Sequence, residues 1–204
     1  FCKDMQEIEI PEKILKNLSQ LYTDKNYVEI IKILDSLLTK YYNSSVLWNI
    51  EGGARLKLKQ MIKSESAFRR SIAINSENHE SHNNLGVVLK EKGENYEAID
   101  CFKKSIIIKP NFFEGYNNLG ITYHKLQKYN DSIFNFKKAI QINPNYFLAY
   151  FNLGTTYLDI GNNEEAILFF KKAIAFQPKN FEVHYNLGNA YERLKLYNFS
   201  ITSY

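Results

Sequence analysis

A spacing of 34 residues runs through this chain and limits what it can fold into more than any other feature. It is kept by glycines and prolines: Gly52, Gly86, Gly120, Gly154, Gly188, Pro110, Pro144 and Pro178. A fixed period of this length indicates a repeat protein, in which each repeat buries its apolar face against its neighbours. With the glycine as eighth residue, the repeats span residues 11–44, 45–78, 79–112, 113–146, 147–180 and, incompletely, 181–204. Residues 1–10 are an N-terminal extension, and the repeat 11–44 is degenerate but in register.

Each repeat carries apolar residues at two sets of helical spacings. In the first half, position seven is mostly leucine and position eleven is mostly leucine or tyrosine, four residues apart on one helical face. In the second half, position twenty is mostly small and position twenty-four is mostly an aromatic ring, as in Ala98 and Phe102. Glycines between the halves, such as Gly93, suit the left-handed residue that ends a helix. Each repeat is therefore predicted to be a pair of antiparallel helices, and the chain to be all-α.

The recurring glycine and proline have steric explanations. Glycine inside a helix costs up to about 1 kcal/mol relative to alanine, so its return at position eight, with small residues at position twenty, predicts a close approach of two backbones. The proline ends the second helix, because proline inside a helix clashes with the preceding turn. Asn111, Asn145 and Asn180 then stand where the next helix is expected to be capped, and Glu114 and Glu182 fall in its first turn, where the helix dipole favours them.

Taken together, these residues resemble the tetratricopeptide repeat, with Leu-Gly at positions seven and eight, Tyr at eleven, Ala at twenty, Phe at twenty-four and Pro at thirty-two. The match is strong in the three repeats from residue 79 to residue 180. In the repeat 45–78, three of the family's residues are replaced by Glu51, Arg55 and Ser76. The resemblance implies a right-handed superhelical solenoid whose first helices line a concave groove, and a role in binding other proteins. Pentatricopeptide RNA-binding repeats have a similar shape but a 35-residue period and no such Leu-Gly pair.

Asparagine recurs on the side of the first helix that is predicted to face the groove. At 100° per residue, positions four, seven, eight and eleven cluster on the packing side, and positions two, five, six, nine, twelve and thirteen cluster roughly opposite. Position six is asparagine in four successive repeats, and position five is asparagine in three. The predicted groove residues are Asn49, Asn83, Asn84, Asn117, Asn118, His124, Phe151, Asn152, Tyr185, Asn186 and Asn189.

The side-chain amides of these asparagines match the backbone of an extended peptide. Asparagine is a mediocre helix former, so its return at one position indicates a purpose besides helix stability. Its amide offers two donors and an acceptor, and helices about 8 to 10 Å apart would place one amide near every third residue of an extended chain. The arrangement resembles the asparagine-lined groove of O-GlcNAc transferase repeats, which implies a grip on a partner's backbone. The alternative is an idle surface copied by duplication.

Other kinds of function find little support in the sequence. The formal net charge is +4, without a block of like charges, and groove acids such as Glu80 argue against nucleic acid as the ligand. His79 and His82 lack a third ligand, so no metal or other cofactor is expected. No nucleophile and base, and no phosphate-binding loop, occur at a diagnostic spacing, so the chain is not expected to be an enzyme. The basic carboxylate clamp of chaperone-binding repeats is also absent.

Cysteine usage and hydropathy indicate a cytoplasmic protein that does not enter the membrane. Cys2 and Cys101 show no CxxC spacing, which fits a reducing compartment, and Cys101 is expected in the core. No apolar run approaches the roughly 20 residues that span a bilayer. The N-terminus lacks the order of a signal peptide and begins at Phe1, so a trimmed fragment is expected.

The sequence thus predicts a protein-protein interaction module that binds an extended peptide of unknown identity in its groove. One alternative is the substrate-recruiting part of a larger transferase, because residues 45–75 are similar to bacterial arrays that precede sulfotransferase or glycosyltransferase domains. Another is scaffolding or self-assembly. Because the last repeat is incomplete, we expect an exposed apolar edge that frays after about Leu196 or self-associates, formed by Tyr191, Leu194, Tyr197, Phe199 and Ile201.

Overall fold

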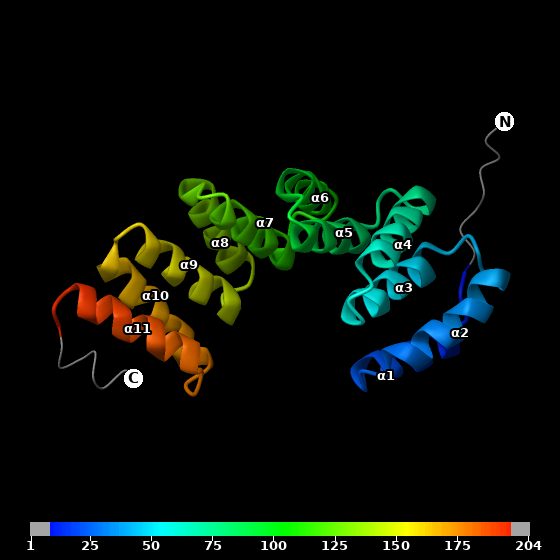
Figure 1. Cartoon of the computed structure of the whole chain (residues 1–204), viewed down its shortest axis with the longest axis horizontal. Coiled ribbons are helices and arrows are strands. Elements are labelled where there is room, and N and C mark those ends of the chain that lie inside the picture. The colour runs from blue at the N-terminus through cyan, green and yellow to red at the C-terminus, as the bar shows by residue number, and fades with distance from the viewer. Residues whose placement is uncertain (1–8, 197–204) are drawn as a thin grey trace. The chain divides into compact units, whose positions relative to one another are not determined.

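The computed structural model describes residues 9–196, and every regular element among these residues is an α-helix. The chain divides into two compact units, Phe1–Pro110 and Asn111–Tyr204, called here the N-terminal and C-terminal units. Each is described by itself. The predicted all-α array of helix pairs is confirmed (Figure 1). None of the helices within the described residues is both long and apolar enough to cross a membrane.

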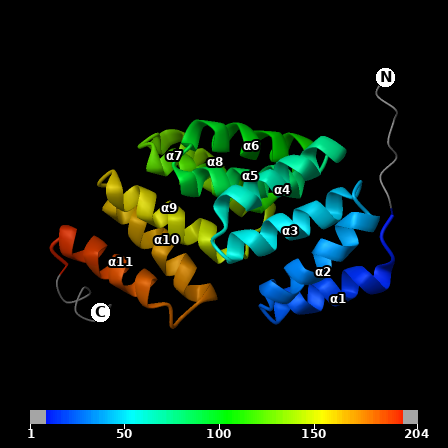
Figure 2. The same ribbon diagram turned by 45° about the vertical axis from the view of Figure 1, so that its right-hand side comes forward.

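The described part of the N-terminal unit, residues 9–110, consists of three successive helix pairs. They are α1 (Glu12–Thr23) with α2 (Tyr27–Lys40), α3 (Ser45–Lys57) with α4 (Met61–Ile74), and α5 (His79–Lys92) with α6 (Asn95–Ile108). Each helix packs against the next along the chain, and the first helices α3 and α5 also touch each other (Figure 2). A buried cluster including Leu18, Ile30 and Leu34 gives the degenerate first pair its own core.

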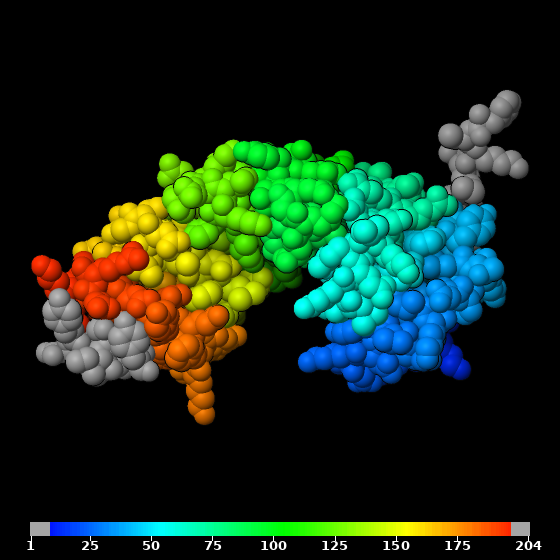
Figure 3. All heavy atoms as spheres, in the orientation of Figure 1, coloured from blue at the N-terminus to red at the C-terminus, as the bar shows by residue number. Residues whose placement is uncertain are grey.

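Over residues 111–196, the C-terminal unit repeats the arrangement with five helices. They are α7 (Phe113–Lys125), α8 (Tyr129–Ile142), α9 (Phe147–Asp159), α10 (Asn163–Phe176) and α11 (Phe181–Arg193). The first helices α7, α9 and α11 lie side by side, and the side chains of α9, α10 and α11 form one continuous surface in the space-filling view (Figure 3). Of the expected apolar edge, Tyr191 is buried and Leu194 is half-buried, whereas Tyr197, Phe199 and Ile201 lie outside the described residues.

Position eight is closely packed in each complete repeat from residue 45 to residue 180, but the neighbour of the glycine is an aromatic side chain and not the predicted second backbone. A methyl group added to Gly120 would lie 2.6 Å from the Phe136 ring, and one added to Gly86 would lie 2.7 Å from the Phe102 ring. These phenylalanines are almost fully buried. The glycine therefore leaves room for an aromatic ring of the second helix of the same pair, which is the reason that the period keeps both residues.

Helix capping follows the prediction at one of the three expected asparagines. The Asn180 side chain accepts a hydrogen bond from the Val183 backbone N–H and caps α11. Asn111 and Asn145 do not cap, since the N-cap residues of α7 and α9 are Phe112 and Tyr146. They stand at position thirty-three, one residue too early for the side chain to reach the first turn. The residues that cap α3 and α5 occupy position thirty-four, as Asn180 does; they are Ser44 and Asn78.

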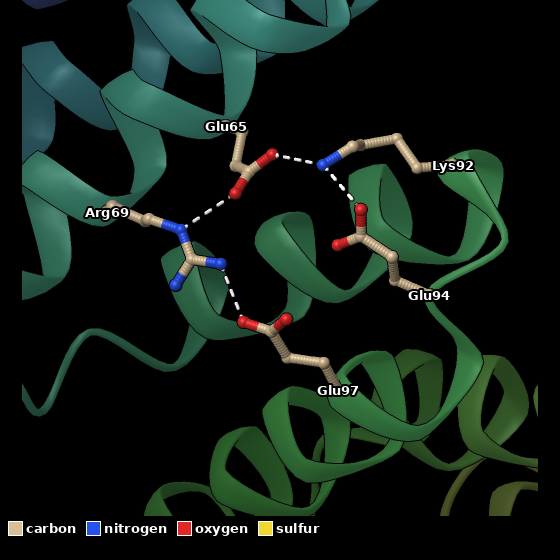
Figure 4. Close-up of polar contacts among 5 residues, drawn as sticks. All are labelled: Glu65, Arg69, Lys92, Glu94 and Glu97. Atoms are coloured by element: carbon tan, nitrogen blue, oxygen red, sulfur yellow. Dashed lines mark hydrogen bonds and ion pairs between the residues drawn. The ribbon is translucent and has the colours of Figure 1, made fainter.

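One contact between repeats of the N-terminal unit is ionic where its counterparts are apolar. Glu65 of α4 accepts from Lys92 at 2.8 Å and from Arg69 at 2.9 Å, Lys92 also contacts Glu94 at 2.7 Å, and Arg69 contacts Glu97 of α6 at 2.6 Å (Figure 4). We call these five residues the ionic cluster. Glu65 stands at position twenty-one of its repeat and Lys92 at position fourteen of the next repeat. In the C-terminal unit these two positions are apolar, as Ile133 with Ile160 and as Ile167 with Leu194.

Candidate functional site

The inner face of each unit is defined here by positions two, five, six, nine, twelve and thirteen of its first helices. In the N-terminal unit the neighbouring first helices with groove asparagines are α3 and α5, and in the C-terminal unit they are α7, α9 and α11. Because the backbone bonds of each helix are satisfied internally, the side chains at these positions decide what the face can bind.

In each unit, an asparagine pair links two neighbouring first helices. The Asn84 Nδ2 donates to Asn49 Oδ1 at 3.2 Å, and the Asn152 Nδ2 donates to Asn117 Oδ1 at 3.0 Å. In both pairs, position six of one repeat donates to position five of the repeat before it, which we call the lateral amide bond. Each bond holds the donating amide in one orientation and uses one of its two N–H donors, leaving one donor and the oxygen.

The structure places two predicted groove residues differently from the prediction. Asn117 is only 3% exposed, because α9 packs beside α7 and covers position five, and Asn83 is also buried. Asn117 therefore acts through Asn152 and has little surface of its own to offer a ligand. Asn49 is half-buried, and its Nδ2 is 3.4 Å from Glu80 Oε2, so its amide is also engaged within the protein.

The lateral amide bond cannot form at Asn186, because position five of the preceding repeat is Phe151. Within residues 9–196, the Asn186 side chain makes no hydrogen bond, although it is half-buried on α11. The neighbouring position five on α11 is Tyr185, which is 49% exposed. Asn186 thus keeps both amide donors and its oxygen available, beside aromatic residues on two helices.

Aromatic residues form a stacked pair on each of the last two first helices. The rings of Phe147 and Phe151 on α9 are 6.1 Å apart and almost parallel, at 4°. The rings of Phe181 and Tyr185 on α11 are also 6.1 Å apart, at 24°. Phe181 is 72% exposed, and Leu148 beside the first pair is exposed as well. The N-terminal ends of α9 and α11 therefore present apolar surface next to Asn186.

At the opposite ends of the first helices, His124 has a partner that the sequence did not suggest. The prediction placed it on the groove without a neighbour, but its Nε2 lies 2.9 Å from Asp159 Oδ2 on α9, and its ring packs edge-on against Tyr129. This contact ties α7 to α9. The remaining predicted groove residues, Asn118 and Asn189, are half-buried at positions six and nine.

Position four has a role that sequence reasoning missed. In four repeats, the ring at this position donates to the backbone carbonyl six residues earlier: Trp48 to Tyr42, His82 to Ser76, Tyr150 to Pro144 and His184 to Pro178, over 2.8 to 3.0 Å. His82 and His184 were expected to be packed rings, and they are also hydrogen-bond donors. The signal was present in the sequence, because tryptophan, histidine and tyrosine share a ring N–H or O–H that phenylalanine lacks.

The described residues contain little that indicates catalysis. Within residues 9–196, no three His, Cys, Asp or Glu side chains gather closely enough to hold a metal ion. Cys101 is half-buried on α6; burial raises the pKa of its thiol to about 11, and the charge of Glu97 adds to the increase. Because the thiolate is the reactive form, this thiol is a poor nucleophile at neutral pH.

Solved structures of similar fold cover most of the chain. MamA has a TM-score of 0.70 at 23% identity, over 78% of this chain and 87% of MamA. YrrB, described as a TPR protein with an unusual peptide-binding site, has a TM-score of 0.67 at 16% identity, over 83% and 88%. PilF of Pseudomonas aeruginosa has a TM-score of 0.73 at 17% identity, over 78% and 72%. No curated protein sequence matches the chain.

Models of one repeat family match the chain from residue 88 to residue 195. A TPR repeat model matches residues 88–127 and 154–195, and two tetratricopeptide repeat models match residues 113–146 and 135–167. These residues include the glycine, aromatic and proline positions of the period, and the helix pairs have the expected fold. The fold supports a role as a protein-protein interaction module. The chain belongs to the tetratricopeptide repeat family.

Proposed function

We propose that this protein binds an extended segment of a partner protein along the inner face of its C-terminal unit, and that the amides of Asn118, Asn152 and Asn186 hold the backbone of that segment. The observation that carries the proposal is the return of an asparagine at position six of three neighbouring helices, each half-buried on the same face.

The chemistry of these amides supports a backbone ligand. A peptide unit offers one N–H and one C=O, and an asparagine side chain offers both complementary groups. The lateral bond to Asn117 orients Asn152 before a ligand arrives, which lowers the entropy lost on binding. A backbone grip is indifferent to most side chains, so several partner sequences are accepted unless other residues discriminate.

The binding test uses the full 204-residue chain and a library of random 12-residue peptides displayed on phage. A selected peptide is synthesised with a fluorescent label, and its affinity is measured by anisotropy. Replacing the three asparagines by alanine should weaken binding about 10- to 1,000-fold, because each net hydrogen bond contributes about 0.5 to 1.5 kcal/mol.

The control is Asn130→Ala, an exposed asparagine on the second helix α8, which should leave the affinity unchanged. Circular dichroism melting shows whether each variant is folded. If the library yields no binder, or if the triple variant binds the selected peptides as tightly as the parent, the proposal is wrong.

A further inference from the structure

We propose that Asn186, together with Phe151 and Tyr185, determines the specificity of the inner face. At this place the inner face binds a partner segment that carries a large apolar side chain, preferably aromatic, with no acidic residue beside it. This inference rests on the proposed function, since it assumes that the inner face of the C-terminal unit binds an extended segment.

The first argument is the difference between position five in successive repeats. Where it is asparagine, as in Asn117, the next amide is tied laterally and the asparagine itself is buried. Where it is Phe151, the lateral acceptor is missing and Asn186 makes no side-chain hydrogen bond within the described residues. One substitution in the repeat pattern thus produces both an available amide and an aromatic ring at the same place.

The second argument is the apolar surface around that amide. Phe151 stacks on Phe147 and Tyr185 stacks on Phe181, so rings from two neighbouring helices lie at the same helical positions. Phe181 and Tyr185 are substantially exposed, at 72% and 49%. A partner segment that places an apolar side chain against Phe181 and Tyr185 removes these rings from water. The Asn186 amide can then hydrogen-bond the backbone N–H and C=O of the same segment.

The third argument is charge. Position two of the three first helices holds Glu114, Leu148 and Glu182, so the charged side chains in the first turns of α7 and α11 are acidic. The first turn of α9 has no acidic residue. An acidic side chain beside the apolar one would be repelled, whereas a neutral or basic one is accepted.

The experiment repeats the phage selection with the full chain and with a matched set of variants. Phe151→Asn restores the residue found in the preceding repeats and should let Asn186 form the lateral amide bond. The variant should lose the preference for apolar peptides, and it should bind the peptides selected by the parent about tenfold more weakly or worse. Phe151→Leu keeps apolar bulk without a lateral acceptor and should lose less than about threefold. Because Phe151 also contacts the buried Phe170, Tyr185→Ser provides a variant at an exposed residue, and it should lose at least threefold.

The outcomes separate this inference from the proposed function. Peptides selected by the parent should be rich in Phe, Tyr, Trp or Leu and poor in Asp and Glu, and Phe151→Asn should lose this preference. Selected peptides that depend on Asn118, Asn152 and Asn186 but show no apolar preference would overturn the inference and leave the proposed function standing. The inference is equally wrong if folded Phe151→Asn and Tyr185→Ser variants select and bind the same peptides as the parent. A library that yields no inner-face binder overturns both.

Discussion

At the scale of single residues, glycine and phenylalanine form a closely packed pair in the repeats from residue 45 to residue 180. Gly120 faces the ring of Phe136, and a methyl group there would lie 2.6 to 3.0 Å from three ring carbons. Gly120→Ala should therefore destabilise the C-terminal unit by about 1 to 3 kcal/mol, although alanine is the better helix former by about 1 kcal/mol. Urea unfolding measures the change, and the additional substitution Phe136→Leu should recover part of it. An alanine variant as stable as the parent would show that the ring moves freely.

The position-four donors provide a second residue-scale prediction. The Tyr150 hydroxyl donates to the Pro144 carbonyl at 3.0 Å, and removing it leaves that carbonyl without this donor. Tyr150→Phe should cost about 0.5 to 1.5 kcal/mol of unfolding free energy. Tyr150→His should cost less, because histidine makes the same bond at His82 and His184. Equal melting temperatures for the parent and the phenylalanine variant would contradict this role.

Sequence reasoning succeeded with residues whose role is steric and repeated, and failed where a role depends on a partner in another repeat. Close packing at the position-eight glycine was predicted from helix propensity, although the neighbour is an aromatic ring and not a second backbone. The lateral bond from Asn152 to Asn117 joins residues 35 apart, and helical periodicity assigns both to the groove without showing that one covers the other. The partner of His124, Asp159, is also 35 residues away.

At the scale of helices, the end of each first helix carries strain where glycine is missing. Position fifteen is left-handed throughout the described repeats: Gly93 and Gly161 have φ of 88° and 84°, whereas Lys25, Lys59, Gln127 and Lys195 have φ of 57° to 59°. A residue with a side chain costs about 1 kcal/mol or more there. Gln127→Gly should therefore raise the unfolding free energy by about 0.5 to 1 kcal/mol, and the reciprocal Gly161→Ala should lower it. Thermal melts of both variants measure these changes. A lower stability of Gln127→Gly, or a higher stability of Gly161→Ala, would show that position fifteen is not strained.

Helix α3 differs from the other first helices by a charged pair in its packing face. Arg55 contacts Glu51 at 2.6 Å, and their side chains are only 13% and 9% exposed. Removing one partner of such a pair is costly, so Arg55→Ala should destabilise the N-terminal unit by about 3 kcal/mol. The double variant Glu51→Leu with Arg55→Tyr, which copies Leu119 and Tyr123, should be neutral or stabilising. Denaturant unfolding of both variants checks this, and a double variant less stable than Arg55→Ala would contradict it.

The helices themselves were largely predictable, but their exact ends were not. Apolar spacing placed two helices in each complete repeat, because that spacing is set by the faces that pack. The caps were assigned partly to the wrong residue, since Asn111 and Asn145 differ from Asn180 by one position in the period. A one-residue shift is decisive for capping, because the side chain must reach the first free N–H groups.

At the scale of the whole molecule, the constant period correctly predicted an array of helix pairs that pack on their sequence neighbours. It did not predict the division into two compact units after Pro110, because the 34-residue spacing continues through that point without a change. In an array the stability is close to a sum of repeat and interface contributions, so substitutions at one interface act mainly on that interface. The ionic cluster lies at an interface where the chain departs from its own pattern, because the equivalent contacts in the C-terminal unit are between apolar residues.

That departure predicts a dependence of the N-terminal unit on pH and salt. Hydrogen bonding to Lys92 and Arg69 holds the pKa of Glu65 below its ordinary value of 4.5, against the opposing effect of burial. A lowered carboxylate pKa contributes stability that is complete above the ordinary value and is lost as the pH falls through the lower folded value. The parent should therefore lose this contribution below about pH 4.5, and 1 M salt should reduce it at pH 7, because the Debye length is then about 3 Å.

The matched variant replaces Glu65 by isoleucine and Lys92 by leucine, the kind of pair found at Ile167 and Leu194. It lacks the titrating contact, so its unfolding free energy should fall less than that of the parent between pH 7 and pH 3. Amide exchange in α4 and α5, measured against α9 and α10 in the same molecule, separates this effect from the general titration of carboxylates. In the parent, the protection of α4 and α5 relative to α9 and α10 should decrease from pH 7 to pH 3, and in the double variant it should change less. If this relative protection changes equally in both proteins, the ionic cluster does not stabilise the interface between these repeats.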